Sequence, residues 1–444
     1  MAISGKKEPV ILFIGDTVFF LLALWLTLLV RYTSVPDGTL WFEHLVPFSF
    51  LFAIWALVFF IAGLYEKHTL ILKSRLPSII LRAQVINSGI AVIFFYFIPY
   101  FNITPKTNLF IDIVFSFGLI YLWRVYLVSF LGFKRQEKAL LIGSGEEMKE
   151  LKNEVNENPK YGLKFISSLD LNKVDAIDCN EEVLNTVYSQ SVSTIVIDLR
   201  NDKVAPMLPH LYNLIFSKVR FIDKYKVYED IFDRVPLSLV NYNWFLENVS
   251  SGVHSTYDFL KRVMDISISL PLGLISLLVY PFVYIAIKLD DKGSIFFKQD
   301  RVGKGGKIVK IIKFRTMSEK SEDATQYVTR AGEILRNTRI DELPQLWNVI
   351  RGDLSLVGPR PEIPALAKQY EKEIPYYNIR HLIKPGLSGW AQIHQEKPPK
   401  FDIGFDETKT KLSYDLYYIK NRSFMLDLKI ALQTIKTILS RSGV

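Results

Sequence analysis

Two adjacent carboxylates, Asp341 and Glu342, lie in a segment rich in arginine and proline, and their surroundings point to chemistry on a phosphate. The segment reads TRIDELPQLWNVIRGDLSLVGPRP over residues 338–361. An aspartate can attack phosphorus as a covalent nucleophile while a neighbouring glutamate helps to hold a divalent cation, and arginine forks take up charge on phosphoryl oxygens. The dipeptide alone is more typical of a solvated acidic first turn of a helix. The cations around the dyad favour the catalytic interpretation instead.

Three arginines are candidates for contact with a substrate phosphate. Arg315 ends the run KIIKFR, Arg336 precedes Asp341 by five residues, and Arg360 stands between two prolines. Those prolines restrict the backbone and aim the guanidinium with little entropy left to lose. The basic stretch GSIFFKQDRVGKGGKIVKIIKFRTM, residues 293–317, raises the local concentration of anions, or holds the domain against lipid headgroups, or does both.

The first third of the chain contains four apolar runs, each about long enough to cross a bilayer as a helix. They cover residues 10–30, 45–65, 79–101 and 109–131. The whole chain of 444 residues is 49% hydrophobic and 14% aromatic, which is too apolar for an ordinary cytosolic enzyme. Buried helices of a soluble core are the alternative. We predict a four-helix transmembrane domain over residues 1–133.

Basic residues predict how these helices are oriented. Lysines and arginines precede the first run, separate the second from the third and follow the fourth, whereas the opposite loops are nearly free of them. By the positive-inside rule the basic segments face the cytoplasm, and with four crossings so does everything after residue 133. A lone Cys179 forms no intramolecular disulfide. The net charge of +9 suits a surface against anionic lipid, and no motif supports binding to nucleic acid.

Residues 134–250 read as a Rossmann-like α/β domain. The run KALLIGSGEEMKELKNEV from Lys138 indicates a strand, a Gly-x-Gly turn and a helix, and VSTIVIDLR and KVRFIDK indicate buried parallel strands. Gly143 and Gly145 would let the backbone approach a phosphate. However, the third glycine of the dinucleotide fingerprint is missing, and Glu146 and Glu147 would repel an anion. A module without a catalytic role and a regulatory nucleotide site both remain open.

A fifth apolar segment, residues 266–287, has basic residues on both sides, with Lys261 and Arg262 before it and Lys288 after it. Both flanks favour the cytoplasm, so we predict a re-entrant helix that enters and leaves on one face. Pro281 is the predicted break, because proline removes a backbone hydrogen bond and disfavours α geometry in the residue before it. A full crossing is the alternative.

Five motifs, taken in this order, resemble the bacterial sugar transferase family, whose members are polyprenyl-phosphate phosphoglycosyl transferases. They read FFKQDRVG, KFRTM, RIDELPQLWNVIRGDLSLVGPRPE, KPGLSGWAQI and YDLYYIKNRSFMLDLKI and cover most of residues 257–444. The preceding helices and α/β module resemble those of the large members. The resemblance implies that residues 251–444 form a monotopic catalytic domain, α/β but mostly α, in the bacterial inner membrane.

The resemblance also implies a reaction and the roles of the residues. Asp341 would attack the sugar-bearing phosphorus of a UDP-sugar, release UMP and hold a phosphosugar, which undecaprenyl phosphate then accepts. Asp341 and Glu342 are the candidate ligands of Mg²⁺, Glu342 would help to bind the metal or assist proton movement, and Arg315, Arg336 and Arg360 match positions that contact phosphate. Such a transfer initiates assembly of an exopolysaccharide, a capsule or an O-antigen type of glycan.

One departure and several alternatives accompany this interpretation. The family's re-entrant helix usually breaks at a Ser-Pro pair, where this chain has two leucines at 277 and 278. A membrane nucleotide-sugar dehydratase or epimerase would need the full glycine fingerprint and a Tyr-x-x-x-Lys pair in a helix, and residues 257–261 do not suggest that helix context. A non-catalytic scaffold would tolerate replacement of Asp341.

Some features are not predicted from the sequence. The transferred sugar, the polysaccharide pathway and the oligomeric state, including a homodimer, stay open. Residues 375–380 and 423–441 mix apolar with basic side chains, a pattern typical of helices in the membrane interface.

Overall fold

The computed structural model describes residues 8–65, 76–97, 106–127, 136–158, 161–172, 176–249, 255–290, 293–318, 327–394 and 404–439. The chain divides into two compact units, Met1–Ile231 and Phe232–Val444. Most of the basic residues that orient the apolar runs lie outside the described residues, as do the ends of the third and fourth runs: positions 6, 7, 67, 73, 75, 98–101 and 128–135. The orientation and the boundaries of the three expected domains therefore stay predictions.

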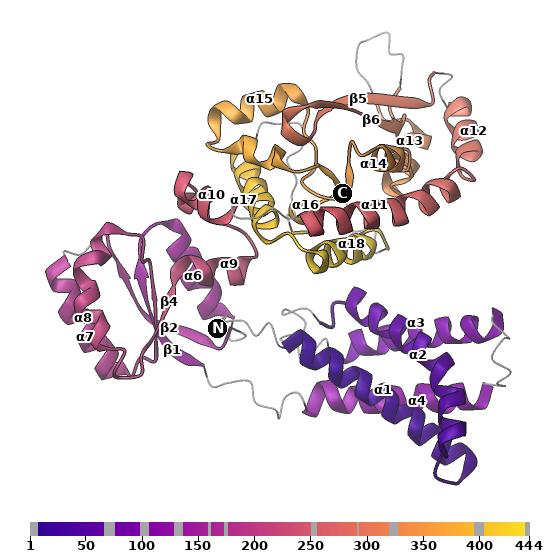
Figure 1. Cartoon of the computed structure of the whole chain (residues 1–444), viewed down its shortest axis with the longest axis horizontal. Coiled ribbons are helices and arrows are strands. Elements are labelled where there is room, and N and C mark those ends of the chain that lie inside the picture. The colour runs from indigo at the N-terminus through magenta and orange to yellow at the C-terminus, as the bar shows by residue number, and fades with distance from the viewer. Residues whose placement is uncertain are drawn as a thin grey trace. The chain divides into compact units, whose positions relative to one another are not determined.

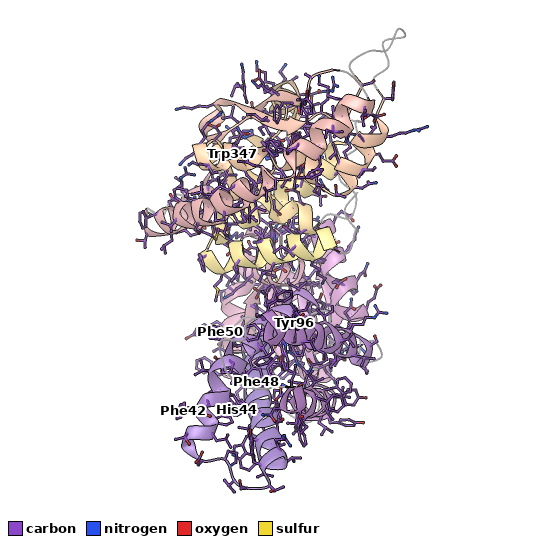
Figure 2. The ribbon with its side chains drawn as sticks, turned by 90° about the vertical axis from the view of Figure 1, so that its right-hand side faces the viewer. Phe42, His44, Phe48, Phe50, Tyr96 and Trp347 are labelled. Atoms are coloured by element: carbon purple, nitrogen blue, oxygen red, sulfur yellow. The ribbon has the colours of Figure 1, made fainter. Side chains whose placement is uncertain are left out.

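Four helices in the first unit are long and apolar enough to cross a membrane, as the sequence predicts. They are α1 (Glu8–Tyr32), α2 (Gly38–Ile61), α3 (Leu76–Phe97) and α4 (Lys106–Leu122), which continues as the π-helical turn η2 (Trp123–Leu127) (Figure 1). Phe48 is buried between them, whereas the side chains of Phe42, Phe50 and Tyr96 are exposed (Figure 2). Exposed apolar surface of this kind is what a lipid environment covers.

A buried ion pair ties the first of these helices to the end of the fourth. Arg124 in η2 donates from Nε to Asp16 at 2.9 Å, and its Nη2 also contacts that carboxylate. Its Nη1 donates to the carbonyl of Leu64 at 2.7 Å, and the guanidinium lies over the ring of Tyr65. An ionisable group in an apolar bundle needs such a partner, because lipid supplies none.

The rest of the first unit is a four-stranded parallel sheet with strand order β2-β1-β3-β4. Helices α6 and α9 cover one face, and α7 and α8 cover the other (Figure 1). Apolar strand residues meet apolar helix residues there, which is why strands and helices alternate along the chain. The elements are β1 (Glu137–Gly143), α6 (Glu146–Glu157), β2 (Leu163–Asp170), α7 (Ala176–Gln190), β3 (Thr194–Ile197), η4 (Asp202–Met207), α8 (Leu208–Asn213), β4 (Arg220–Asp223) and α9 (Lys224–Phe232).

The second unit mixes helices with two small sheets, an antiparallel pair β5-β6 and a parallel pair β7-β8. A Cβ on Gly386 in β8 would lie 2.1 Å from the backbone nitrogen of Gly358, so this close approach of two chain segments requires glycine. The elements before β7 are η5 (Leu237–Leu239), α10 (Tyr242–Asn248), α11 (Ser255–Ser276), α12 (Tyr280–Asp290), β5 (Phe296–Val302), η6 (Lys304–Gly306), β6 (Ile308–Phe314), α13 (Arg330–Asn337), η7 (Ile340–Glu342) and α14 (Gln345–Arg351). The elements from β7 onward are β7 (Ser355–Val357), α15 (Pro364–Glu373), η8 (Tyr377–Leu382), β8 (Gly386–Ser388), α16 (Trp390–His394), α17 (Phe405–Asn421) and α18 (Phe424–Leu439).

Helices α11 and α12 form a bent apolar pair at the segment expected to meet the membrane. Neither helix alone is long and apolar enough to span a membrane, whereas the two together are, and a bend of 56° separates them. The interruption covers residues 277–279, and Pro281 is the second residue of α12, where a missing N–H leaves no helical bond unmade. Pro271 lies inside α11 without ending it. On the inner side, Gly273 faces Trp347 and Ile350 of α14.

Candidate active site

Asp341 lies in a single 3₁₀ turn, η7, between α13 and α14. The residue before this turn, Arg339, has a left-handed backbone conformation with φ of 58°, which reverses the chain after α13. Asp341 is 8% exposed, and its Oδ1 is buried without a hydrogen-bond partner among the described residues. Burial, and then the charge of Glu342, raise the pKa of Asp341. The turn thus presents a carboxylate oxygen that no protein group satisfies.

Glu342, by contrast, is surrounded by cations. Its Oε1 lies 3.4 Å from Nζ of Lys313, 3.5 Å from Nη2 of Arg360 and 3.8 Å from Nη1 of Arg339. Burial alone would raise the pKa of Glu342, but these cations hold it below its ordinary value. Glu342 is therefore paired with cations, whereas Asp341 is buried and has one carboxylate oxygen without a hydrogen-bond partner among the described residues.

The three predicted arginines occupy different places around the dyad. Arg360 contacts Glu342 directly, whereas Arg336, in the last turn of α13, donates from Nε to Oγ1 of Thr316 at 2.9 Å. The positive charge of Arg336 also acts to lower the pKa of Asp341. Arg315 is buried one residue after β6 and next to Thr316, and its backbone N–H donates to the carbonyl of Ile295 at 2.8 Å.

Sequence reasoning gave Lys313 no individual role, although it is one of the three cations on Glu342. It was one of many lysines in a basic stretch. The alternation of side chains along a strand could have singled it out. Lys313 lies in β6 and Arg315 directly follows the strand, so these two side chains, two residues apart, project to the same side.

The backbone that carries Arg360 is held at four successive carbonyls. The carbonyl of Pro359 accepts from the N–H of Gly386 at 3.0 Å, and that of Arg360 accepts from Nη2 of Arg380 at 3.0 Å. The next two, of residues 361 and 362, accept from Nη1 of Arg301 at 3.1 Å and from the N–H of Val302 at 2.9 Å. With these bonds and its two prolines, the loop has little freedom to move the guanidinium away from Glu342.

Arg380 belongs to a buried charge network behind this loop. It is 2% exposed, and Nη2 lies 2.8 Å from Asp415 while Nη1 lies 3.5 Å from Glu362. Glu362 also pairs with Lys411 at 2.7 Å. Although burial opposes it, the two cations lower the pKa of Glu362 to about 2. The interpretation of residues 375–380 as an interfacial segment was therefore wrong at Arg380, because buried acids from distant parts of the chain enclose it.

The carboxylates around Asp341 fit Mg²⁺ only if substrate phosphate and water supply the remaining ligands. Among the described residues, no group of three or more His, Cys, Asp or Glu side chains could hold a metal ion. Mg²⁺ commonly binds through one or two carboxylates and completes its shell with phosphate oxygens and water. The open Oδ1 of Asp341, with Glu342 beside it, matches that arrangement.

The glycine turn after β1 is occupied by protein. Lys224 Nζ lies 2.8 Å from Asp198, and the stem of this lysine fills the space above Gly143, where a Cβ would lie 3.0 Å from its Cδ. Both charged side chains are at most 4% exposed. They lie at the carboxyl edge of the sheet between β1 and β3, where the strand order reverses and ligands usually bind.

In the second unit, Tyr257 and Lys261 both lie on α11, so the expectation that they lack a helix context was wrong.

The sequence of the second unit matches known proteins. A family model described as "Bacterial sugar transferase" matches residues 256–441. The UDP-N-acetylgalactosamine-undecaprenyl-phosphate N-acetylgalactosaminephosphotransferase of Aeromonas hydrophila is 38% identical over 261 residues, which are 56% of this chain and 59% of that protein.

Two further relatives match over shorter stretches. The UDP-glucose:undecaprenyl-phosphate glucose-1-phosphate transferase of Escherichia coli K12 is 39% identical over 42% of this chain and 40% of its own length. The exopolysaccharide production protein PSS of Rhizobium leguminosarum bv. phaseoli is 38% identical over 41% of this chain and 96% of its own length. This chain thus spans about half the length of the first two relatives but nearly all of the third, and it belongs to the bacterial sugar transferase family.

Proposed function

We propose that this protein moves a sugar 1-phosphate from a UDP-sugar to undecaprenyl phosphate and releases UMP. The observation that carries the proposal is the pairing of an open, buried carboxylate on Asp341 with a Glu342 that is held by three cations. The names of two relatives, a UDP-N-acetylgalactosamine-undecaprenyl-phosphate phosphotransferase and a UDP-glucose:undecaprenyl-phosphate transferase, support the choice of substrates.

The proposed first step is attack on the donor. A carboxylate oxygen of Asp341 forms a bond to the sugar-bearing phosphorus of the UDP-sugar. The bond from that phosphorus to the oxygen bridging the two phosphates breaks, and UMP leaves with that oxygen and its electron pair. The product is a phosphosugar carried on the carboxylate of Asp341.

In the proposed second step, an oxygen of undecaprenyl phosphate attacks the same phosphorus. The acyl phosphate bond to Asp341 breaks, the carboxylate is restored, and a lipid-linked diphosphosugar leaves. One site can thus serve a water-soluble donor and a lipid acceptor in turn.

The charges around the site suit an anionic nucleophile that must approach an anionic diphosphate. Lys313, Arg339 and Arg360 surround Glu342, and Arg336 lies within electrostatic reach of Asp341. Fixed cations of this kind lower the repulsion between carboxylate and phosphate without reorganising during the reaction. We further propose that Asp341 and Glu342 hold Mg²⁺, which when bound would neutralise charge on the diphosphate.

We also propose that the bent pair α11–α12 is re-entrant and that the site lies at the cytoplasmic face of the inner membrane. The 56° bend and the basic residues Arg262 and Lys288 at opposite ends of the apolar stretch support a path that returns to its starting face. Single cysteines at Asp258 and Asp290, in a chain whose Cys179 is replaced by Ser, should react with a membrane-impermeant thiol reagent from the same side. Labelling from opposite sides would favour a full crossing instead.

The test of the reaction is UMP release by the purified full-length protein, given Mg²⁺, undecaprenyl phosphate and a panel of UDP-sugars. UDP-glucose and UDP-N-acetylgalactosamine head the panel, because they appear in the names of relatives. Asp341→Asn should reduce release by at least about a thousandfold, since it removes the nucleophile. The matched control is Asp300→Asn, at an exposed aspartate in β5, which should keep the parent rate.

Omitting the acceptor separates the two steps. The parent protein should then gain the mass of one sugar phosphate, and Asp341→Asn should not. If Asp341→Asn turns over like the parent, the nucleophile is misassigned. If no donor yields UMP, the transfer itself is refuted, and a scaffold for other glycan enzymes becomes the better account.

A further inference from the structure

The second unit contains a cavity of about 300 Å³ whose lining includes none of the residues around Asp341. It lies beside α11, near the start of the bent apolar pair, and its volume is at the small end of the range for ligand pockets, about 300–1,000 Å³. Five of the lining side chains are cationic and two are acidic. The lining residues are Tyr257, Asp258, Lys261, Arg262, Asp265, Lys304, Ser355, Ile383, Lys384, Tyr418 and Arg422.

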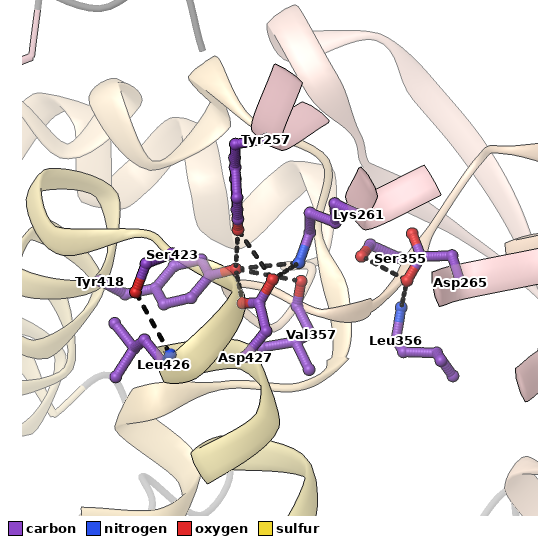
Figure 3. Close-up of polar contacts among 10 residues, drawn as sticks. All are labelled: Tyr257, Lys261, Asp265, Ser355, Leu356, Val357, Tyr418, Ser423, Leu426 and Asp427. Carbon is purple, nitrogen blue, oxygen red and sulfur yellow. Dashed lines mark hydrogen bonds and ion pairs between the residues drawn. The ribbon is translucent and has the colours of Figure 1, made fainter. Parts of the chain in front are cut away.

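One of the cations is compensated within the protein. Lys261 donates to Oδ2 of the fully buried Asp427 at 2.8 Å, and the hydroxyls of Tyr257 and Tyr418 donate to the same carboxylate at 2.8 and 2.7 Å (Figure 3). This cluster joins α11 to α17 and α18 and forms one rigid wall of the cavity.

Asp265, one of the two lining acids, is also engaged, through hydrogen bonds. Asp265 accepts from Oγ of Ser355 at 3.1 Å and from the N–H of Leu356 at 3.0 Å (Figure 3). Arg262 donates to the carbonyls of Val349 and Ile350 at 2.7 and 2.6 Å and so caps the carboxyl end of α14. These contacts fix the frame of the cavity and use none of the other lining cations, Lys304, Lys384 and Arg422.

No ion pair joins Lys304, Lys384 or Arg422 to an acid among the described residues, although the charges of Asp265 and Asp353 act on Lys384. Nε of Arg422 is buried without a hydrogen bond. Burial, and then the charge of Arg262, lower the pKa of Lys384, and Lys304 acts in the same direction, against the opposite effect of Asp265 and Asp353. A concave surface with crowded positive charge and few acids is suited to an anion with several oxygens, which accepts several hydrogen bonds at once.

Exposed apolar side chains stand next to the cationic ones along the chain. On α11, Phe259 is 68% and Leu260 is 47% exposed, directly between Asp258 and Lys261. On α18, Phe424 is 47% and Met425 is 74% exposed, just after Arg422. A cationic pocket with exposed apolar side chains next to its lining residues along the chain fits a ligand that has an anionic head and a hydrocarbon chain.

We propose that this cavity binds the phosphate headgroup of a membrane lipid, at a site separate from Asp341. Lys304, Lys384 and Arg422 contact the phosphate oxygens, and the exposed side chains of α11 and α18 lie against the hydrocarbon. The lipid comes either from the bulk bilayer, as a phospholipid, or from the pool of lipid phosphate that the proposed reaction consumes. The site would hold the catalytic unit at a fixed depth in the membrane interface.

Native mass spectrometry of the full-length protein in detergent tests the site, with phosphatidylglycerol, undecaprenyl phosphate and inorganic phosphate as separate probes. The variant is Lys304→Gln with Lys384→Gln. Its control is Lys307→Gln with Lys372→Gln, which removes the same charge at two exposed lysines outside the lining. Loss of two charged contacts should weaken binding of one lipid by at least about tenfold in the variant only.

The probes distinguish the two sources of the lipid. Tenfold weaker phosphatidylglycerol binding in the variant supports a bulk lipid. If only undecaprenyl phosphate shows the loss, so that the variant binds one molecule fewer than the control, the lipid is the acceptor. Because phosphatidylglycerol is no substrate of the proposed transfer, its binding is informative whether or not UMP is released.

Three results would overturn the inference. Equal lipid binding by variant and control would remove the site. Inorganic phosphate that binds as tightly as either lipid would remove the lipid assignment. Finally, Lys304→Arg with Lys384→Arg keeps both charges and should bind like the parent, so its failure to bind either lipid would refute the assignment of binding to charge contacts at this cavity.

Discussion

Replacement of Arg380 by methionine should destabilise the second unit strongly. Arg380 is 2% exposed and lies 2.8 Å from Asp415 and 3.5 Å from Glu362. Removing one partner of a buried ion pair costs about 3–5 kcal/mol, because it leaves a buried charge uncompensated. Glu362 keeps its ion pair with Lys411, whereas Asp415 retains only the electrostatic effect of Lys411, so the cost falls mainly on Asp415. For a unit of this size, a loss of that order lowers the melting temperature by about 6–20 °C.

Thermal unfolding of the detergent-solubilised protein measures this effect. The control is Asp406→Asn, which breaks an exposed i,i+3 pair with Lys409 at 3.3 Å and should shift the melting temperature by less than about 2 °C. The double variant Arg380→Met with Asp415→Asn removes both charges and should unfold at a higher temperature than Arg380→Met alone. A single variant that melts with the control, or a double variant that melts no higher than the single one, would refute the reasoning.

Two further predictions concern Asp341. Its raised pKa means that the carboxylate needed for attack is lost as pH falls through a value above the 3.8 of an ordinary aspartate. UMP release should therefore decline on the acid side with a midpoint above that value, and Glu342→Gln should move the midpoint down, because the charge of Glu342 raises the pKa of Asp341. A pH–rate profile measures both, and an upward move in the variant would contradict the assignment. The third prediction concerns the metal. Among the described residues only two carboxylates, of Asp341 and Glu342, are proposed to bind Mg²⁺, so EDTA should remove it and stop UMP release, and added Mg²⁺ should restore release. Undiminished release in EDTA would exclude a required metal.

Much of the membrane region could be predicted from sequence, because long apolar runs report helices directly. The four N-terminal helices and the apolar stretch of α11–α12 follow from hydropathy and length, whereas the interruption at residues 277–279 does not. The alternation of strand and helix between residues 136 and 232 could also be predicted, because the central strands β1 and β3 are apolar and buried. The expectation that KVRFIDK forms a buried strand was wrong, since β4 lies at the edge of the sheet and none of its residues is fully buried.

The dyad and Arg360 could also be predicted, since they are close together in one motif. The partners that fix them could not. Lys313 reaches Glu342 from 29 residues upstream, and Arg380 reaches the carbonyl of Arg360 from 20 residues downstream. Such pairings depend on how β6, η7 and η8 pack, and a chain with many charges offers too many alternatives for pattern alone to select them.

The pairing of Asp16 with Arg124 makes the order of synthesis matter. The two residues are 108 positions apart, one on the first membrane helix and the other after the fourth. While α1 alone has entered the bilayer, its carboxylate has no cation, and a charged residue within a membrane helix opposes insertion by at most about 2.5–3.5 kcal/mol, the cost at the helix centre. Asp16 gains its cation only when the fourth helix of the bundle and Arg124 have emerged from the ribosome. Maturation of the bundle is therefore complete only when its final segment arrives, and a chain truncated before Arg124 leaves α1 with an unpaired acid in the membrane.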